Sequence, residues 1–597
     1  MTGERGRTIK RGGISLLIAT IVAGTCLAGP INVTFTPVFE GDSASPVRVT
    51  ITNTGEGKQG EVYIEEGLYT RYPFDLPTGA NKSIVVPTNQ YGYRDDIKVR
   101  IGNQVFTEPP TGRQYERERD RRLAVISDEA FAFIRQNPSK PMTESNSVFA
   151  GTKPELAPDR TKAFDGYAGI VLDQGAERLN DAQVRAIQAH TLQGGTLIFI
   201  GGSSAAVLRD PRWKAFIGGS VSGTSNVKDK LLQSVPPVTF SATSVSRPKG
   251  ISPLLNGYAD YRTVGNGRVI LYRMNPFEPG ISGASISLAT LMKAVILTQI
   301  AQSDQVTSPG RYGGTSSYAN PYEEQSPYFG TTLNMARGGF QRAMIPVWIF
   351  AALLVPLAII IPRKMKRDQL SWVLIPVIGF GITLYILRNQ VGKSETSIQV
   401  ISDANVFAQE GLADGVLLGR SMMFFPRAGQ YDIGLPPVDQ VWGGSYEDSF
   451  DGYPDSMGYG GAAGVSLVDN GKVQLGPVPT QNLTTRAIRY RAECPGAGTW
   501  IKVKKGAASE EYVITNTSPY DFQSVSIEYP VSGDSEESTA QTSGKLARGQ
   551  SISIRLMNGG TGIPRVLCTL DGYNFGPQIG KRVTNVRFHF QLGGRLW

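Results

Sequence analysis

The sequence predicts a multidomain membrane protein with two β-rich regions, a parallel-sheet α/β domain and a two-helix transmembrane hairpin. Three patterns indicate this fold class. Short alternating strands separated by turn residues occupy both ends of the chain, whereas apolar strands separated by helical stretches occupy the middle. Before the C-terminal region, two long apolar runs flank a short basic cluster. The 597 residues leave room for about three or four domains.

Residues 1–29 have the pattern of a signal peptide or signal anchor. Basic residues precede an apolar segment of about 15 residues that ends before Pro30. These basic residues are Arg5, Arg7, Lys10 and Arg11. A cleaved signal and an uncleaved anchor both predict that the following domain is exported.

Residues 30–115 are expected to form an immunoglobulin-like β-sandwich. The segment VRVTIT at 47–52 alternates polar and apolar residues, a turn follows at 53–57, and EVYIEE alternates again. The letters ITNT occur at 51–54 and again at 514–517, each time between two alternating segments. This shared strand–turn–strand context predicts a second sandwich in the C-terminal region.

Residues 120–305 change to an alternating β/α pattern. The segments LAVIS at 123–127, GYAGIVLD at 166–173 and TLIFIGG at 196–202 are apolar strands without strict alternation. Asn180 is placed to cap a helix that the pair Gly194-Gly195 ends. Strands of this kind, separated by helices, predict a parallel sheet covered on both faces.

The segments LNDAQVRAIQAHTLQGGTLIFIGG and GNGRVILYRMNPFEP resemble the class I glutamine amidotransferase-like domains of bacterial membrane proteins. The resemblance covers residues 120–305 and implies a flavodoxin-like fold. It also implies a nucleophilic cysteine on the turn after TLIFI and a catalytic histidine in the second segment. Those places hold Gly201-Gly202-Ser203-Ser204 and Asn275 instead. Because the catalytic cysteine and histidine of that family are replaced here, the chain is expected to be a pseudoenzyme.

Two interpretations of this turn stay open. In the first, Ser203 is the nucleophile of a hydrolase that uses a lysine or carboxylate as its base. In the second, the two glycines only permit a tight turn. The two histidines, His190 in the helix and His589 in a C-terminal strand, are not placed to activate Ser203. The crevice at the C-terminal ends of the parallel strands is the expected ligand site. Its candidate residues are Gly201, Gly202, Ser203, Ser204 and Asn275.

Residues 344–388 are predicted to form two transmembrane helices with a cytoplasmic loop at 363–368. Both apolar runs are uncharged and close to the roughly 20 residues that span a bilayer. The loop is placed in the cytoplasm by its basic residues, which are Arg363, Lys364, Lys366 and Arg367. This topology predicts a multi-pass protein of the bacterial plasma (inner) membrane with most of the chain outside the cytoplasm. A buried helical hairpin of a soluble core is the alternative.

Two further regions flank this hairpin. Residues 309–342 are rich in Gly, Tyr and Pro and are expected to be a flexible linker. Residues 395–597 carry many short strand patterns and are expected to be an all-β region outside the cytoplasm. Cys494 and Cys568 lie in that region, where either a disulfide or two buried free thiols fit the pattern.

The composition narrows the expected partners. The net charge is +9, but the densest charged run, at 113–122, mixes both signs, so no nucleic acid is expected. The acidic loop with Asp448, Asp451 and Asp455 lacks the EF-hand spacing, and no metal or cofactor is predicted. The lipid bilayer and other envelope proteins are the expected partners.

Together these patterns predict a non-catalytic, membrane-anchored protein of the cell envelope. It would present an amidotransferase-like domain and β-sandwich domains for contacts with proteins or ligands. The alternative function is an exported hydrolase or amidase with Ser203 as its nucleophile.

Overall fold

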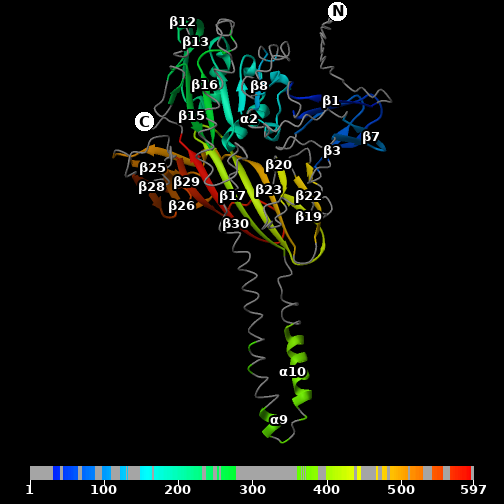
Figure 1. Ribbon diagram of the computed structural model, residues 1–597. Helices are drawn as coiled ribbons and strands as arrows, with labels where there is room; N and C mark the ends of the chain where they lie inside the picture. Colours follow the sequence, from blue (N-terminus) through cyan, green and yellow to red (C-terminus); the bar gives the residue numbers. More distant parts are fainter. Residues whose placement is uncertain are drawn as a thin grey trace, which may run out of the picture.

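The protein is predominantly β in the part of the chain that its computed structural model describes (Figure 1). That part contains six β-sheets and five α-helices, and the longest helix has 16 residues. The described residues are 31–40, 45–64, 70–87, 97–108, 122–128, 131, 148–164, 167, 169–230, 237–246, 252–254, 257–276, 278, 348, 352, 360–364, 366, 369, 371–386, 398–435, 440–444, 465–467, 473–480, 484–508, 511–528, 541–555 and 565–592.

The N-terminal module is a β-sandwich of two layers. One sheet has the order β1-β2-β5, and the other contains β4-β3-β6-β7. Every second residue of β2 is buried, so its alternating sequence produces one core-facing side. Its Val49 and Ile51 share a core with Val99 and Ile101 of the opposite sheet. The strands are β1 (Ile31–Pro37), β2 (Val47–Asn53), β3 (Lys58–Ile64), β4 (Thr70–Leu76), β5 (Asn81–Val86), β6 (Ile97–Ile101) and β7 (Gln104–Thr107).

The last part of the described chain repeats this topology (orange and red in Figure 1). The sheet β24-β25-β28 corresponds to β1-β2-β5, and the strands β27-β26-β29-β30 correspond to β4-β3-β6-β7. The match in both sheets makes this a second sandwich with the same strand order. Its strands are β24 (Ile501–Lys505), β25 (Glu511–Asn516), β26 (Asp521–Glu528), β27 (Gln541–Ser543), β28 (Ser551–Arg555), β29 (Arg565–Asp571) and β30 (Lys581–Gln591).

A buried asparagine closes the same turn in both sandwiches. Asn53 ends β2, and its Oδ1 accepts the Gly55 N–H at 3.0 Å. Its Nδ2 donates to the carbonyls of Glu56 at 2.8 Å and Leu76 at 3.1 Å. Since Leu76 lies at the far end of β4, this one side chain ties the turn to the opposite sheet.

Asn516 does the same in the second sandwich. Its Oδ1 accepts the Ser518 N–H at 3.0 Å, and its Nδ2 donates to the carbonyls of Tyr520 at 2.8 Å and Leu546 at 3.1 Å. Both asparagines are completely buried. The two ITNT segments therefore occupy equivalent places, and the repeat in the sequence reflects a repeat in the structure.

Each sandwich receives a further strand in parallel orientation from another part of the chain. β17 (Gln399–Gln409) pairs with β30 along all eleven of its residues. β21 (Val465–Leu467) pairs with β4 at Thr70 and Arg71. β17 is also an interior strand of the wide sheet, whose order is β20-β23-β18-β17-β30-β29-β26-β27. The remaining strands here are β18 (Gly415–Phe425), β19 (Gly429–Leu435), β20 (Gln440–Gly444), β22 (Val473–Thr480) and β23 (Thr484–Cys494).

The middle module is built on a seven-stranded mixed sheet with the order β14-β15-β16-β11-β10-β8-β9. The five strands from β16 to β9 are parallel, and β14 and β15 add antiparallel pairs at one edge. The strands are β8 (Arg122–Ile126), β9 (Val148–Thr152), β10 (Gly169–Leu172), β11 (Thr196–Ile200), β14 (Ser252–Leu254), β15 (Ala259–Val264) and β16 (Gly267–Tyr272).

The prediction of a flavodoxin-like domain is wrong for the described residues. Such a fold needs a helical layer on both faces of the sheet. The module has one long helix here, α2 (Asp181–Gln193), while α3 (Ala206–Arg209) and α4 (Lys214–Ile217) have four residues each. A β-hairpin of β12 (Val221–Asp229) and β13 (Val238–Val245) adds antiparallel structure instead. The helix expected at 285–302 lies outside the described residues.

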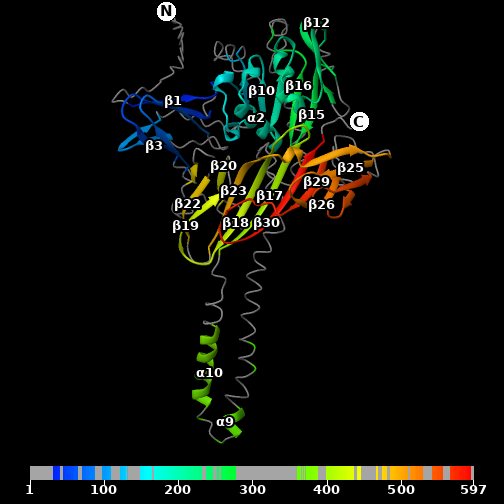
Figure 2. The same cartoon turned by 180° about the vertical axis from the view of Figure 1, so that it is seen from behind.

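Helix α2 lies between the middle sheet and the wide C-terminal sheet (Figure 2). Asn180 caps it as expected, with a reciprocal pair of hydrogen bonds to Gln183 at 2.8 and 3.0 Å. Its buried Val184 and Ile187 share one core with Leu418 of β18. At the C-terminal end of α2, Gln193 accepts a 2.7 Å hydrogen bond from Arg491 of β23 in the wide sheet. The wide sheet therefore packs on the side of α2 that faces away from the middle sheet.

The predictions of a transmembrane hairpin and of an inner-membrane location are also wrong for the described residues. No helix within the described ranges is long and apolar enough to cross a membrane. The second apolar run forms α10 (Ser371–Ile386) of 16 residues, and the loop before it contains α9 (Ile361–Lys364). Both helices lie beyond one end of the β modules (Figures 1 and 2). Most of 344–360 lies outside the described residues, as do Arg367, 1–29 and 309–342.

The two C-terminal cysteines are buried and free. Cys494 lies in β23 and Cys568 in β29, four positions apart in the wide sheet. At about 4.8 Å per strand this is far more than the roughly 6 Å that a disulfide spans between Cα atoms. The Cys494 thiol instead lies 3.2 Å from the Tyr573 hydroxyl. The alternative of two buried free thiols therefore describes this region.

We expect Asn53→Ala to destabilise the N-terminal sandwich by about 3 kcal/mol, because it leaves several buried backbone groups without a partner. Asn81→Ala, at an exposed position of β5, is the matched control and should change stability by less than about 0.5 kcal/mol. Chemical denaturation of both variants measures the difference. Equal stability of the two variants would show that the buried asparagine does not hold the turn.

Candidate functional site

Polar side chains meet where the parallel strands of the middle sheet end. Ser127 follows β8, Asp173 follows β10, Ser203 and Ser204 follow β11, and Asn275 lies just beyond β16. The carboxyl ends of parallel strands share one edge of a sheet, which explains why residues distant in sequence come together. Apart from Ser203, which is exposed, all of these side chains are buried.

These side chains form a connected hydrogen-bond chain. The Asn275 amide donates to the hydroxyls of Ser203 at 3.1 Å and Ser204 at 3.0 Å. The Ser127 hydroxyl donates to Oδ2 of Asp173 at 2.8 Å. The Ser204 hydroxyl also faces the Asp173 carboxyl. Most polar groups at this edge are therefore bonded to one another, while Oδ1 of Asp173 is buried without a hydrogen-bond partner among the described residues.

Burial dominates the electrostatics of Asp173. Loss of hydration raises the pKa of this carboxyl, and hydrogen bonds from Ser204 and Ser127 oppose the rise without cancelling it. Its side chain is completely buried, so solvent cannot exchange protons with it directly. Asp173 is a buried acid that holds the strand ends, and it has no contact with the exposed Ser203.

The β12–β13 hairpin covers part of this edge. The Thr243 hydroxyl accepts the Gly202 N–H at 2.8 Å, and Ala242 forms a bridge with Met274. Gly202 has a φ of +63°, and a Cβ there would lie 2.6 Å from the Ser241 carbonyl oxygen. A Cβ on Gly201 would lie 2.8 Å from the Tyr272 carbonyl oxygen. Gly202 is thus required for close packing under the hairpin, and Gly201 for close packing against the end of β16.

The predicted crevice residues Gly201, Gly202, Ser203, Ser204 and Asn275 therefore do lie together, but they do not form a catalytic constellation. A nucleophilic serine needs a base within about 3.2 Å of its hydroxyl. Among the described residues, the group that contacts the Ser203 hydroxyl is the Asn275 amide, which is a donor. Asp173, Ser127 and Thr243 were missed in the sequence, although two of them stand at the ends of predicted strands.

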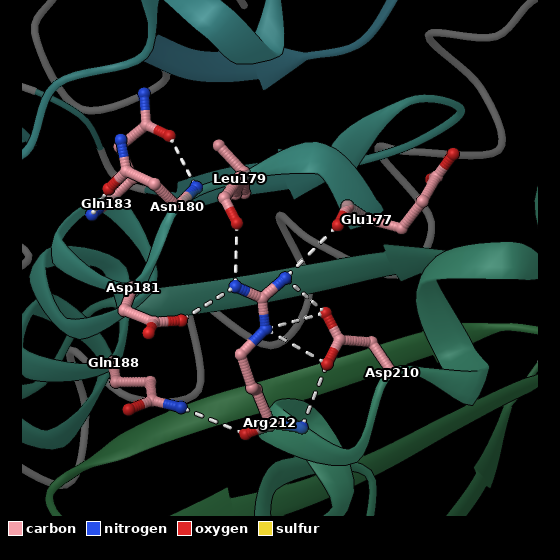
Figure 3. Close-up of polar contacts among 8 residues, drawn as sticks. All are labelled: Glu177, Leu179, Asn180, Asp181, Gln183, Gln188, Asp210 and Arg212. Carbon is pink, nitrogen blue, oxygen red and sulfur yellow. Dashed lines mark hydrogen bonds and ion pairs between the residues drawn. The ribbon is translucent and has the colours of Figure 1, made fainter.

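An arginine fixes the segment that follows the serine turn (Figure 3). Arg212 is bound by the carboxylate of Asp210, with its Nε 3.0 and 3.1 Å from the two oxygens. Its Nη1 donates to the Leu179 carbonyl at 2.6 Å and to Asp181 at 3.1 Å. Its Nη2 donates to the Glu177 carbonyl at 3.1 Å. This guanidinium ties the turn to the start of α2 and leaves no N–H free for a ligand.

Neither histidine takes part in the site. His190 is buried in α2, with its ring centroid 6.0 Å from that of Phe164. His589 is half-buried in β30, where its ring stacks on Phe407 at 4.9 Å and its Nε2 lies 3.0 Å from Oδ1 of Asn405. Burial, reinforced by Arg565 and Arg587, lowers the pKa of His589 to about 3. His589 is therefore a neutral packing residue at physiological pH.

No cluster of metal-ligating side chains occurs in the described part of the chain. Asp448, Asp451 and Asp455, the residues of the acidic loop, lie outside that part.

Comparisons with known proteins cover only parts of the chain. The model of a family described as a domain of unknown function, DUF8726, matches residues 30–114, which span the N-terminal sandwich. No curated protein matches. Two structures of the yeast delta-COP-I mu-homology domain, one with a Dsl1 WxWxV peptide, match with 11% identity and a TM-score of 0.19. They cover 33% of this chain and 96% and 95% of their own. So low a score carries no conclusion, and the amidotransferase resemblance stays a prediction.

Asp173→Asn should become more stabilising, relative to the natural protein, as the pH rises above about 4. The folded-state pKa of Asp173 is raised, so between the ordinary pKa of about 3.9 and the raised value the unfolded chain releases a proton that the folded protein keeps. The natural protein loses stability over that window, and the asparagine variant does not. Thermal melts across this pH range test the prediction. Asp75→Asn, at an exposed position of β4, is the control for loss of a carboxylate. A difference that does not change with pH would contradict the assignment.

Acid should destabilise the natural protein more than His589→Gln. The folded-state pKa of His589 lies far below the ordinary 6.5, so below pH 6.5 the unfolded chain gains a proton that the folded protein excludes. At pH 5 this costs about 2 kcal/mol, and glutamine retains a donor for Asn405 without the charge. Denaturation curves at pH 7 and pH 5 measure the effect. Parallel losses in both proteins would refute the role of His589.

Proposed function

We propose that this chain is a non-catalytic interaction protein whose β-sandwich and α/β modules present surfaces to protein or ligand partners. One observation carries the proposal: the exposed Ser203 hydroxyl is bound by an amide donor where a hydrolase would hold a base. An unassisted serine hydroxyl has a very high pKa and is a poor nucleophile.

The rest of the strand edge supports the same function. Ser204 and Asp173 are buried and bonded within the edge, and the β12–β13 hairpin packs over Gly202. A catalytic edge instead needs its acid and base open to substrate. The two sandwiches, by contrast, offer broad surfaces of a kind that commonly spaces modules or binds partners.

A serine-directed fluorophosphonate probe tests the proposal on the intact protein. We expect no labelling above that of Ser203→Ala, because no base within the described residues is hydrogen-bonded to the Ser203 hydroxyl. Ser222→Ala, at an exposed serine of the hairpin, is the matched control, and an active serine hydrolase verifies the probe. Labelling that Ser203→Ala abolishes and Ser222→Ala preserves would overturn the proposal and favour the hydrolase.

A further inference from the structure

The two sandwiches bind an added strand at different edges. In the second sandwich, β17 pairs in parallel with β30. In the first, the equivalent of β30 is β7, and β6 is its one strand neighbour among the described residues. The first sandwich instead receives β21 on β4, at its other edge. Parallel strand addition therefore occurs twice within this chain. By analogy with the second sandwich, a third added strand is expected at the edge of β7, and no described strand pairs there.

The side chains of β7 show what the missing strand would cover. Phe106 packs on the sandwich core but is only partly buried. In β30, which β17 covers, Phe588 and Phe590 have exposed fractions of 0% and 1%. Val105 of β7 is 52% exposed. An added strand would bury the apolar edge that the second sandwich already buries.

The edge of β7 also lacks the usual protection against strand addition. Edge strands are commonly guarded by lysines or proline. Edge strand β24, for example, carries Lys502 and Lys504 on its exposed side. The four residues of β7, QVFT, include neither a charge nor a proline. An edge strand without such protection can pair with other chains and promote aggregation unless a partner strand occupies it.

We propose that the outer edge of β7 (Gln104–Thr107) is a docking site for an extended segment of a partner protein, which adds as a parallel strand. Main-chain hydrogen bonds supply affinity, and apolar side chains at alternate positions cover Phe106. The segment resembles β17, in which Val400, Ala404 and Val406 are buried on one side. This inference deepens the proposed interaction function and rests on it.

A peptide that copies residues 399–409 is the probe. Added to the full-length protein, it should slow hydrogen exchange of the outward amides within 104–107 by about tenfold when bound at saturation. The same peptide with N-methyl groups on one edge cannot form the ladder and should give no protection. Protection confined to β30, through displacement of β17, would overturn the proposal, and so would an equal effect of the methylated peptide.

Two variants at one position sharpen the test. Gln104 is exposed and lies opposite the buried Ile101, so it shares the core-facing side of the edge. Gln104→Lys should weaken peptide binding by about tenfold, whereas Gln104→Leu should preserve it. Equal binding to both variants, or dimerisation of the protein through β7 in place of peptide binding, would overturn the proposal. Probe labelling at Ser203 is a separate readout, so failure here is distinguishable from failure of the non-catalytic function.

Discussion

The packing of α2 between two sheets is the constraint on which the rest of the structure depends. Val184 and Ile187 join a core that the middle sheet shares with Leu418 of the wide sheet, and Arg491 reaches across to Gln193. A single helix cannot bury two faces unless the sheets on both sides are in place. The middle module and the C-terminal region therefore share a core.

Two sandwiches with the same strand order surround this core. Asn53 and Asn516 close the same turn in two sandwiches of the same strand order. Each copy is then joined to the rest of the chain by an extra parallel strand, at β4 in one copy and β30 in the other. The modules are thus connected by backbone pairing.

Local features could be predicted from the sequence, and long-range ones could not. The alternation of polar and apolar residues predicted β2, and the capping residues Asn180 and Gly194 predicted α2. Both signals depend only on residues close together in the sequence. The flavodoxin-like assignment failed because an apolar strand such as TLIFI shows that the sheet is buried but not which elements cover it. Among the candidate site residues, the serine turn and Asn275 were found, but Asp173 was missed because a carboxyl at a strand end normally signals a turn. The pairing of β17 with β30 joins segments too distant for any local pattern.

Hydrogen exchange of α2 in Leu418→Ala tests the central claim most directly. Leu418 is buried in the shared core, yet it lies more than two hundred positions beyond the helix in the sequence. If the two modules share that core, amides of residues 181–193 should exchange faster in the variant, together with those of β17 and β18. Faster exchange confined to β17, β18 and β23, with α2 unchanged, would contradict the account.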